Sequence, residues 1–162
     1  MILHFLRHAT AQDIATSDAA RELTKEGREE ARVAGQALVA LGVRPSQILT
    51  SPLVRARQTA ELVAHELKFT DPLVVAQELL NDTGTGDLMR AIRPFTGTKE
   101  IVLVGHMPSL AEHVLASIGA KSAPGLSIGK GGLASVDFGE LRAGTGRLLC
   151  LLRQKQLRAI RP

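Results

Sequence analysis

Short apolar runs of strand length alternate along the chain with longer segments in which apolar residues recur every three or four positions. The four clearest short runs cover residues 2–6, 47–50, 73–76 and 101–104. Strands separated by segments of helical periodicity are typical of units in which a crossover helix joins parallel strands. The pattern therefore predicts an α/β fold, namely a three-layer αβα sandwich with a mostly parallel central sheet and helices on both faces.

Four segments combine helical periodicity with residues that favour helix ends: 24–42, 51–67, 87–92 and 108–119. In the first, Thr24 is a suitable N-cap and Gly42 a suitable stop. Proline in the first turn opens the second and the fourth. Residues 101–104 are apolar at every position, which a strand covered on both faces requires.

Two closing strands are predicted over residues 133–138 and 147–152, joined by a glycine-containing hairpin loop. The chain has no internal repeat, linker or low-complexity tract, and 162 residues with 44% apolar content suffice for one core. We therefore expect a single domain over residues 1–152, followed by a basic C-terminal tail over residues 153–162.

Composition narrows the class of protein. Four Phe and no Trp or Tyr leave little for stacking on single-stranded nucleic acid, and the four basic residues of the tail account for the whole net charge of +4. Cys150 is the lone cysteine and lies in an apolar run that favours burial. His4 and Arg7 interrupt the first apolar run too early for a secretory signal, and no stretch approaches membrane-spanning length. We expect a cytoplasmic monomer with no nucleic-acid or membrane partner.

Residues suited to phosphate follow three of the predicted strands. Arg7 and His8 follow the first, Ser51 and Arg55 the second, and His106 the fourth. Ligands of open parallel sheets collect beyond the carboxyl ends of the strands. We therefore expect these residues to form one shared phosphate site.

Arginine and histidine are the residue types that phosphoryl transfer needs. A guanidinium stays protonated and grips two oxygens, so Arg7 and Arg55 are candidate clamps, with surface ion pairs as the alternative. A neutral imidazole can attack phosphorus and form a phosphohistidine that water hydrolyses, so His8 and His106 are candidate nucleophiles. Packing or surface roles are expected for the other three histidines: His4, His65 and His113. No spacing matches a zinc site, and no metal or cofactor is expected.

The second predicted helix would present several residues to this site on one side: Arg55, Gln58, Thr59 and Leu62. Arg57 lies on the other side and is expected to be solvated. The amino ends of this helix and of the helix after Pro108 would also offer unpaired N–H groups to an anion.

Three motifs in this order resemble the signature of the histidine phosphatase superfamily, the phosphoglycerate-mutase-like enzymes: Arg7-His8-Ala9-Thr10-Ala11, the run from Ser51 to Thr59, and Gly105-His106. The form of the first motif, the run 17–27 and the short length are similar to the SixA branch of phosphohistidine phosphatases. The resemblance spans from Leu3 to about Pro108. It implies a phosphatase with His8 as nucleophile and with Arg7, Arg55 and His106 around the phosphoryl group.

Further site residues are expected from the same resemblance. Arg21, in the SixA-like run, would add a third guanidinium at the rim, with a plain surface arginine as the alternative. Ser51 and Met107 are expected to contribute to substrate binding.

The sequence leaves open which residue acts as general acid and which substrate is hydrolysed, and the two questions are linked. Glu78, just beyond the third strand, falls where phosphomonoesterases and mutases of the superfamily keep their acid, but a surface charge is the alternative. An alkoxide leaving group needs a proton from the enzyme, whereas the imidazole of phosphohistidine can leave already protonated on its other nitrogen. The stretch 79–101 leaves room for one short helix, so we expect an open pocket that admits a side chain of another protein.

These observations predict hydrolysis of phosphohistidine on a phosphorelay or phosphocarrier protein, a role in signal transduction, through an intermediate on His8. The alternative is a phosphatase of small phosphate esters that uses Glu78 as acid. Two further alternatives are a domain that only binds phosphate, which would not need a nucleophile, and nucleic-acid binding through the tail.

Overall fold

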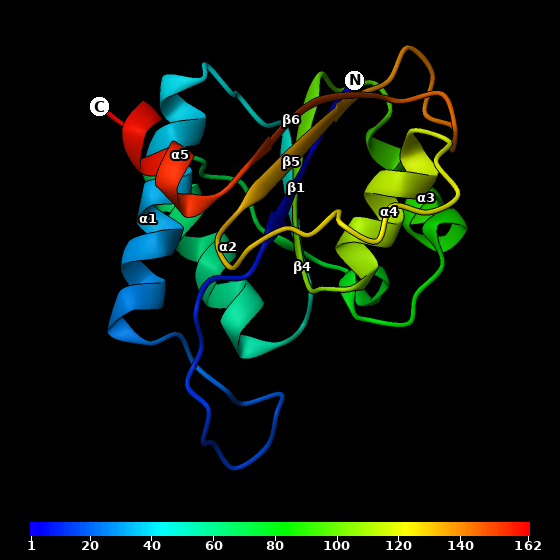
Figure 1. The fold of residues 1–162 in the computed structure, drawn as a ribbon. Coiled ribbons are helices and arrows are strands. Elements are labelled where there is room, and N and C mark those ends of the chain that lie inside the picture. The colour runs from blue at the N-terminus through cyan, green and yellow to red at the C-terminus, as the bar shows by residue number, and fades with distance from the viewer.

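The computed structural model describes residues 1–162 and contains one six-stranded sheet of strand order β3-β2-β4-β1-β5-β6 (Figure 1). The strands are β1 Ile2–Arg7, β2 Gln47–Thr50, β3 Val74–Val75, β4 Glu100–Gly105, β5 Leu133–Asp137 and β6 Arg147–Leu152. β3, β2, β4 and β1 pair in parallel, and β5 pairs antiparallel with β1 and with β6. The predicted mostly parallel α/β sheet is therefore confirmed.

Helices cover both faces of the sheet, with α1, α2 and α5 on one side and α3 and α4 on the other (Figure 1). They are α1 Lys25–Ala40, α2 Val54–Leu67, α3 Thr85–Ile92, α4 Ser109–Ser117 and α5 Gln154–Ile160. Ile101 and Leu103 of β4 pack under α3 and α4, whereas Val102 and Val104 pack under α1 and α2. This double coverage explains why β4 is apolar at these successive positions. No helix combines the length and apolar character needed to cross a lipid bilayer.

The strand register brings the predicted motifs to one edge of the sheet. Arg7 of β1 pairs with Gly105 of β4. The pattern continues past the strand ends, because His8 N donates to Gly105 O at 3.0 Å and Ser51 N donates to Val104 O at 2.9 Å. The carboxyl ends of β1, β2 and β4 therefore meet where sheets of this kind bind ligands.

The helix starts follow local capping. α1 begins after Thr24, as predicted, and the side chain of Thr24 accepts a hydrogen bond from Gly27 N at 3.0 Å. α2 begins at Val54, with Leu53 as its N-cap, so the helix starts later than Pro52 suggested. The third strand is shorter than predicted, since β3 lies at the sheet edge and pairs only with β2.

Gly27 allows α1 to pack against the segment that follows β1. A Cβ atom at this position would overlap Thr10 O. The same segment is held by Thr24 N, which donates to Thr10 O at 3.0 Å, and by Glu30 Oε2, which accepts from Thr10 N at 2.8 Å. The residues directly after His8 are therefore fastened to the start of α1.

The last ten residues belong to the domain, which corrects the prediction of a tail over residues 153–162. α5 packs against α1, and Leu157 is fully buried in the core on that side of the sheet. Leu157 and Ile160, three positions apart, form an apolar stripe that the surrounding charges hid from the sequence analysis. The basic residues of this segment therefore lie on or next to a helix that is packed against the rest of the domain.

We expect Leu157→Ala to lower the free energy of unfolding by about 2–5 kcal/mol, because it removes a fully buried side chain from a packed core. Urea denaturation followed by circular dichroism measures this change. Lys155→Ala, at an exposed position of the same helix, is the matched control and should change stability little. Equal stability of both variants would mean that α5 is not part of the cooperative unit.

Candidate active site

The four predicted catalytic residues lie together at the carboxyl edge of the sheet. Arg7 ends β1 and His8 follows it, Arg55 lies in the first turn of α2, and His106 follows β4. The ring centroids of His8 and His106 are 4.9 Å apart, with the ring planes inclined at 51°. Both rings are buried, at 9% and 3% exposure. The two rings are close enough for one tetrahedral oxyanion to touch both.

His8 is held in a form that can act as a nucleophile. Its Nδ1 lies 2.8 Å from Ala9 O. A carbonyl oxygen only accepts, so Nδ1 carries the proton and Nε2 keeps its lone pair. Burial above all, and then the positive charges of Arg55 and Arg7, lower the pKa of His8 to about 4. The ring is therefore neutral at pH 7.

Ser51 orients His106. The Nε2 atom of His106 lies 2.7 Å from Ser51 Oγ, which also accepts a hydrogen bond from Leu53 N at 3.3 Å. Burial first, followed by the neighbouring His8 and Arg55, lowers the pKa of His106 to about 3. When the Ser51 hydroxyl donates to Nε2 of this neutral ring, the ring proton lies on Nδ1.

Arg55 is fixed by hydrogen bonds at both ends of the residue. Its Nη1 donates to Asp18 O at 2.7 Å and its Nη2 donates to Asp18 Oδ2 at 3.0 Å. Thr59 Oγ1 donates to Arg55 O at 2.7 Å and accepts from Ala9 N at 3.1 Å. The predicted side of α2 therefore contacts the β1 motif, while Arg57 is exposed as expected.

Three nitrogens of the site are buried and have no hydrogen-bond partner in the protein: Arg7 Nε, Arg55 Nε and His106 Nδ1. The side chain of Arg7 makes one hydrogen bond, from Nη1 to Ile128 O at 3.0 Å. Leaving a buried donor unpaired costs about 1–3 kcal/mol. With the His106 proton on Nδ1, all three nitrogens are donors, so the oxygens of an anion would satisfy them together.

Lys130 is a cation near the site that the sequence analysis missed. It lies on a turn in which Gly132 N donates to Gly129 O at 2.8 Å, and the next residue, Gly131, donates from N to His8 O at 3.2 Å. Lys130 is exposed, and its positive charge contributes to lowering the pKa of His8. A glycine cluster around a lysine just before β5 was the available signal.

Arg21 lies at the rim of the site, where its guanidinium contacts one backbone carbonyl and two carboxylates. Its Nε donates to Gln12 O at 2.5 Å. Nη1 donates to Asp18 Oδ1 at 3.2 Å, and Nη2 lies 3.5 Å from Asp13 Oδ1. Asp18, to which the sequence analysis assigned no role, therefore bridges Arg21 and Arg55. A direct role of Arg21 on the phosphoryl group stays a prediction.

Glu78 and Met107 are half-buried residues beside the site. Glu78 lies in a 3₁₀ helix, η1, of residues Gln77–Leu79, and its backbone carbonyl accepts from Thr83 Oγ1 at 2.8 Å. Its carboxylate makes no hydrogen bond or ion pair with the protein. Met107 packs against the core under α3 and α4. The acid role of the first and the binding role of the second stay predictions.

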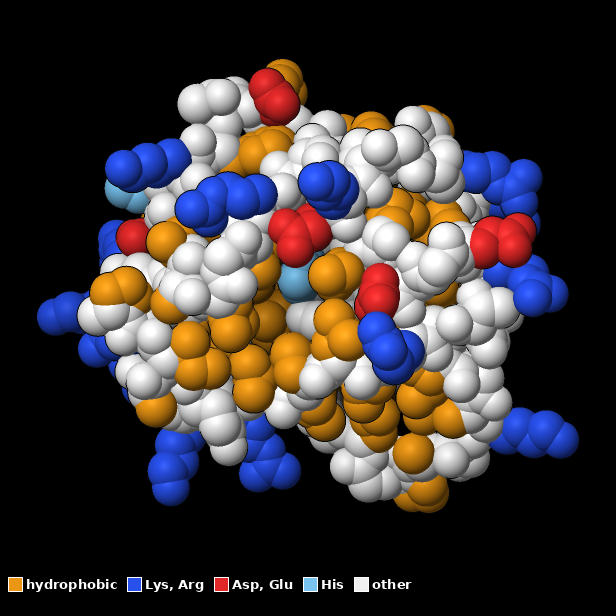
Figure 2. Space-filling view, turned by 90° about the horizontal axis from the view of Figure 1, so that it is seen from above, with side chains coloured by type: hydrophobic (Ala, Val, Ile, Leu, Met, Phe, Trp, Pro, Cys, Tyr) orange, Lys and Arg blue, Asp and Glu red, His pale blue; other side chains and the backbone are white.

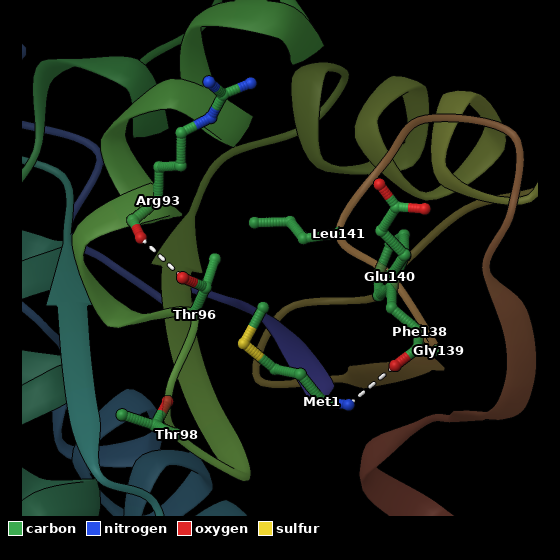
Figure 3. A pocket seen from close by; sticks show the side chains of 8 residues that line it. All are labelled: Met1, Arg93, Thr96, Thr98, Phe138, Gly139, Glu140 and Leu141. Carbon is green, nitrogen blue, oxygen red and sulfur yellow. Dashed lines mark hydrogen bonds between the residues drawn. The ribbon is translucent and has the colours of Figure 1, made fainter.

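One of the largest hollows of the surface, about 550 Å³, lies at the opposite, amino edge of the sheet, an end of the molecule that Figure 2 views from above. Apolar side chains are exposed there between scattered charges (Figure 2). In the hollow itself, Arg93 and Glu140 lie apart, Thr96 Oγ1 donates to Arg93 O, and the amino group of Met1 donates to Phe138 O (Figure 3). Both hydrogen bonds drawn in Figure 3 have backbone carbonyl groups as acceptors. No residue that lines this hollow has a buried side-chain donor without a partner, in contrast to the candidate site.

The hollow next to the candidate site is smaller, about 240 Å³, and is lined by Asp18, Arg21 and neighbouring residues of the loop between β1 and α1. No cavity is lined by His8 or His106. No group of three or more histidine, cysteine, aspartate or glutamate side chains is arranged to hold a metal ion.

The chain is similar in sequence and in fold to known proteins. Residues 3–94 match the model of the histidine phosphatase superfamily (branch 1). The chain is 34% identical over 146 residues to an uncharacterized protein of Picosynechococcus sp., with 88% of each chain covered. It is similar to the structure of the protein histidine phosphatase SixA complexed with tungstate, with a TM-score of 0.87, 26% identity and coverage of 97% of this chain and 99% of that chain. The putative phosphohistidine phosphatase SixA from Agrobacterium tumefaciens gives a TM-score of 0.78, 28% identity and coverage of 93% and 96%.

The chain therefore belongs to the histidine phosphatase superfamily. It is a phosphatase with the phosphoglycerate-mutase-like fold, and it is SixA-like within the superfamily. The resemblance inferred from the three sequence motifs is confirmed.

We expect His8 and His106 to titrate far below 6.5 in the free protein, because burial disfavours the charged rings. The NMR signals of the ring Cε1–H groups, assigned with His8→Ala and His106→Ala, should shift near pH 4 or below. Because the unfolded chain binds protons first as the pH falls below 6.5, stability should also fall over this range. Added inorganic phosphate, whose negative charge favours the protonated rings, should raise both midpoints, and a midpoint near 6.5 for either ring without phosphate would contradict the expectation.

Proposed function

We propose that the protein hydrolyses phosphohistidine carried by a phosphorelay or phosphocarrier protein, through a covalent phosphohistidine on His8. The observation that carries the proposal is the neutral His8 ring, whose Nε2 lone pair is free, beside three buried donors that lack partners. A site that only bound phosphate would not need a ring held in the nucleophilic tautomer. A cytoplasmic location and a role in signal transduction are part of this proposal.

In the first step, the Nε2 lone pair of His8 attacks phosphorus and the phosphorus–nitrogen bond of the substrate breaks. The bonding pair goes to the substrate nitrogen, and the ring leaves as neutral imidazole because its other nitrogen keeps a proton. Arg7 and Arg55 hold the equatorial oxygens, and Nδ1–H of His106 donates to the same group. These donors neutralise the charge that spreads over the phosphoryl group in flight.

In the second step, water attacks the phosphorus bound to His8 and the phosphorus–Nε2 bond breaks. The bonding pair returns to Nε2, and the protons of the water remain on the phosphate product and the solvent. The hydrogen bond from Nδ1 to Ala9 O keeps the ring protonated on the far nitrogen throughout, so His8 leaves as a neutral imidazole.

Two features favour phosphohistidine over an ester. The carboxylate of Glu78 has no hydrogen-bond or ion-pair partner to orient it, and an imidazole leaving group does not require an enzymic acid. The stretch between β3 and β4 is short, which leaves little chain to cover the site against a substrate side chain presented by another protein. This stretch adds only α3 and two 3₁₀ turns.

The second candidate is a phosphatase of small phosphate esters with Glu78 as general acid. One observation favours it: η1 packs on the end of β4, since Leu79 O lies so close to Gly105 that a Cβ there would be 3.0 Å away. Glu78 is therefore carried by a segment next to His106. Nucleic-acid binding through the C-terminal residues is disfavoured, because these residues form a helix packed on α1.

We expect His8→Ala to lower phosphohistidine hydrolysis by about 10³-fold or more, because the covalent route is lost. The assay uses a histidine-phosphorylated phosphocarrier protein, and acid-labile radioactive phosphate on the enzyme reports the intermediate. His65→Ala, whose side chain is 84% exposed on α2, is the matched control and should keep both signals. Label retained by the His8 variant would exclude His8 as the nucleophile.

We expect Glu78→Gln to change phosphohistidine hydrolysis by less than about twofold, because the leaving imidazole needs no proton from the enzyme. If esters are the substrates, the same change should lower activity on sugar phosphates by about 10²–10⁴-fold. Steady-state rates on both substrate classes decide between the two functions. Glu61→Gln, at an exposed position of α2, controls for the loss of one carboxylate.

A further inference from the structure

The carboxylate of Asp18 pairs with the guanidinium of Arg55, the group that is proposed to hold the phosphoryl group. Its Oδ2 accepts from Arg55 Nη2 at 3.0 Å, its carbonyl accepts from Arg55 Nη1 at 2.7 Å, and its Oδ1 accepts from Arg21 Nη1 at 3.2 Å. The next residue, Ala19, accepts from Val54 N at 3.1 Å, which ties the loop to the start of α2. A carboxylate in an anion site opposes phosphate binding, so its presence there calls for a chemical reason.

The hydrogen bonds of Arg55 leave room for both anions. A guanidinium has five N–H groups, and Asp18 takes two of them. The Nε–H group is buried and has no partner, and each Nη keeps a second hydrogen. A phosphoryl group can therefore bind to the same guanidinium beside Asp18. The Asp18 side chain is 66% exposed and lines the hollow of about 240 Å³ next to the site, so its remaining lone pairs are accessible.

Asp18 cannot serve as an acid. Hydrogen bonds from Arg55 and Arg21 hold the pKa of its carboxyl below the ordinary value, so the group stays ionised at neutral pH. Beside a leaving alkoxide an ionised carboxylate is repulsive. Beside a leaving imidazole that carries a proton on its far nitrogen, the same carboxylate is a hydrogen-bond acceptor.

We propose that Asp18 accepts a hydrogen bond from the N–H group of the leaving imidazole and thereby selects phosphohistidine over phosphate esters. The inference rests on the proposed function and deepens it. In the step concerned, His8 Nε2 bonds to phosphorus, the substrate phosphorus–nitrogen bond breaks, and its electron pair stays on the departing nitrogen. The proton on the far nitrogen stays where it is, held toward Asp18, so the ring departs as imidazole and never as imidazolate.

The test compares two small substrates that differ in the leaving group. Phosphoimidazole releases a ring that carries an N–H group, whereas p-nitrophenyl phosphate releases a weakly basic phenolate with no such donor. We expect Asp18→Asn to lower kcat/KM for phosphoimidazole about tenfold or more, because a charge-assisted hydrogen bond becomes a neutral one. With p-nitrophenyl phosphate the same variant should lose much less activity, because the departing phenolate makes no hydrogen bond to Asp18, so the ratio of the two kcat/KM values should fall.

Asp13→Asn is the matched control. Asp13 lies in the same loop and contacts Arg21 but not Arg55, so the Asp13→Asn variant should show the same ratio of the two activities as the wild type. If Asp18→Asn lowers both activities by the same factor, Asp18 only positions Arg55, and if it changes neither activity, Asp18 has no role in the reaction. The ratio of the two activities is unchanged in both cases, and either result would overturn the inference. A wild-type protein inactive on phosphoimidazole and on histidine-phosphorylated protein would instead overturn the proposed function, and this inference with it.

Discussion

The parallel pairing of β1 with β4 is the constraint on which the site depends. It sets Arg7 opposite Gly105, and the hydrogen bond from His8 N to Gly105 O then brings two rings, almost one hundred residues apart in sequence, to a centroid distance of 4.9 Å. Both strands are buried on two faces, so a shift in register would place polar residues in two cores at once. The geometry of the histidine pair is thus held by the packing of the whole sheet.

Burial sets the protonation state of the two histidines and also costs stability. Desolvation keeps His8 and His106 neutral, and it leaves the two arginine Nε atoms and Nδ1 of His106 without partners. Such groups destabilise an empty site, and the binding of an anion would relieve that cost. In the empty site, Thr59 links Arg55 to Ala9 by hydrogen bonds, and His8 Nδ1 donates to Ala9 O, so these bonds keep the residues in place. The free energy that the unpaired donors cost the empty site would be recovered when they bind the oxygens of a phosphoryl group, and it would then add to the affinity for that group.

The proposed reaction moves a phosphoryl group between two imidazoles. On the enzyme side, Ala9 O fixes the proton on the far nitrogen of His8. On the substrate side, the proposed role of Asp18 is the equivalent one, with a carboxylate in place of a carbonyl. Such symmetry removes the need for an acid, which agrees with a Glu78 carboxylate that has no partner to orient it.

The sequence by itself determined the layered α/β class, the helix caps and the four residues that meet at the site, because periodicity, capping and strand ends are local properties. Thr24, the apolar run of β4 and the Arg7-His8 pair are readable in this way. Only the tertiary structure decided that α5 is part of the domain, that Asp18 binds Arg55 and that Lys130 lies near His8. These three features depend on contacts between segments that are distant along the chain. The loop that carries Asp18 and the loop that carries Lys130 also lack a periodicity that would predict their paths. Burial, which sets the charge of both histidines, likewise exists only after the sheet has formed.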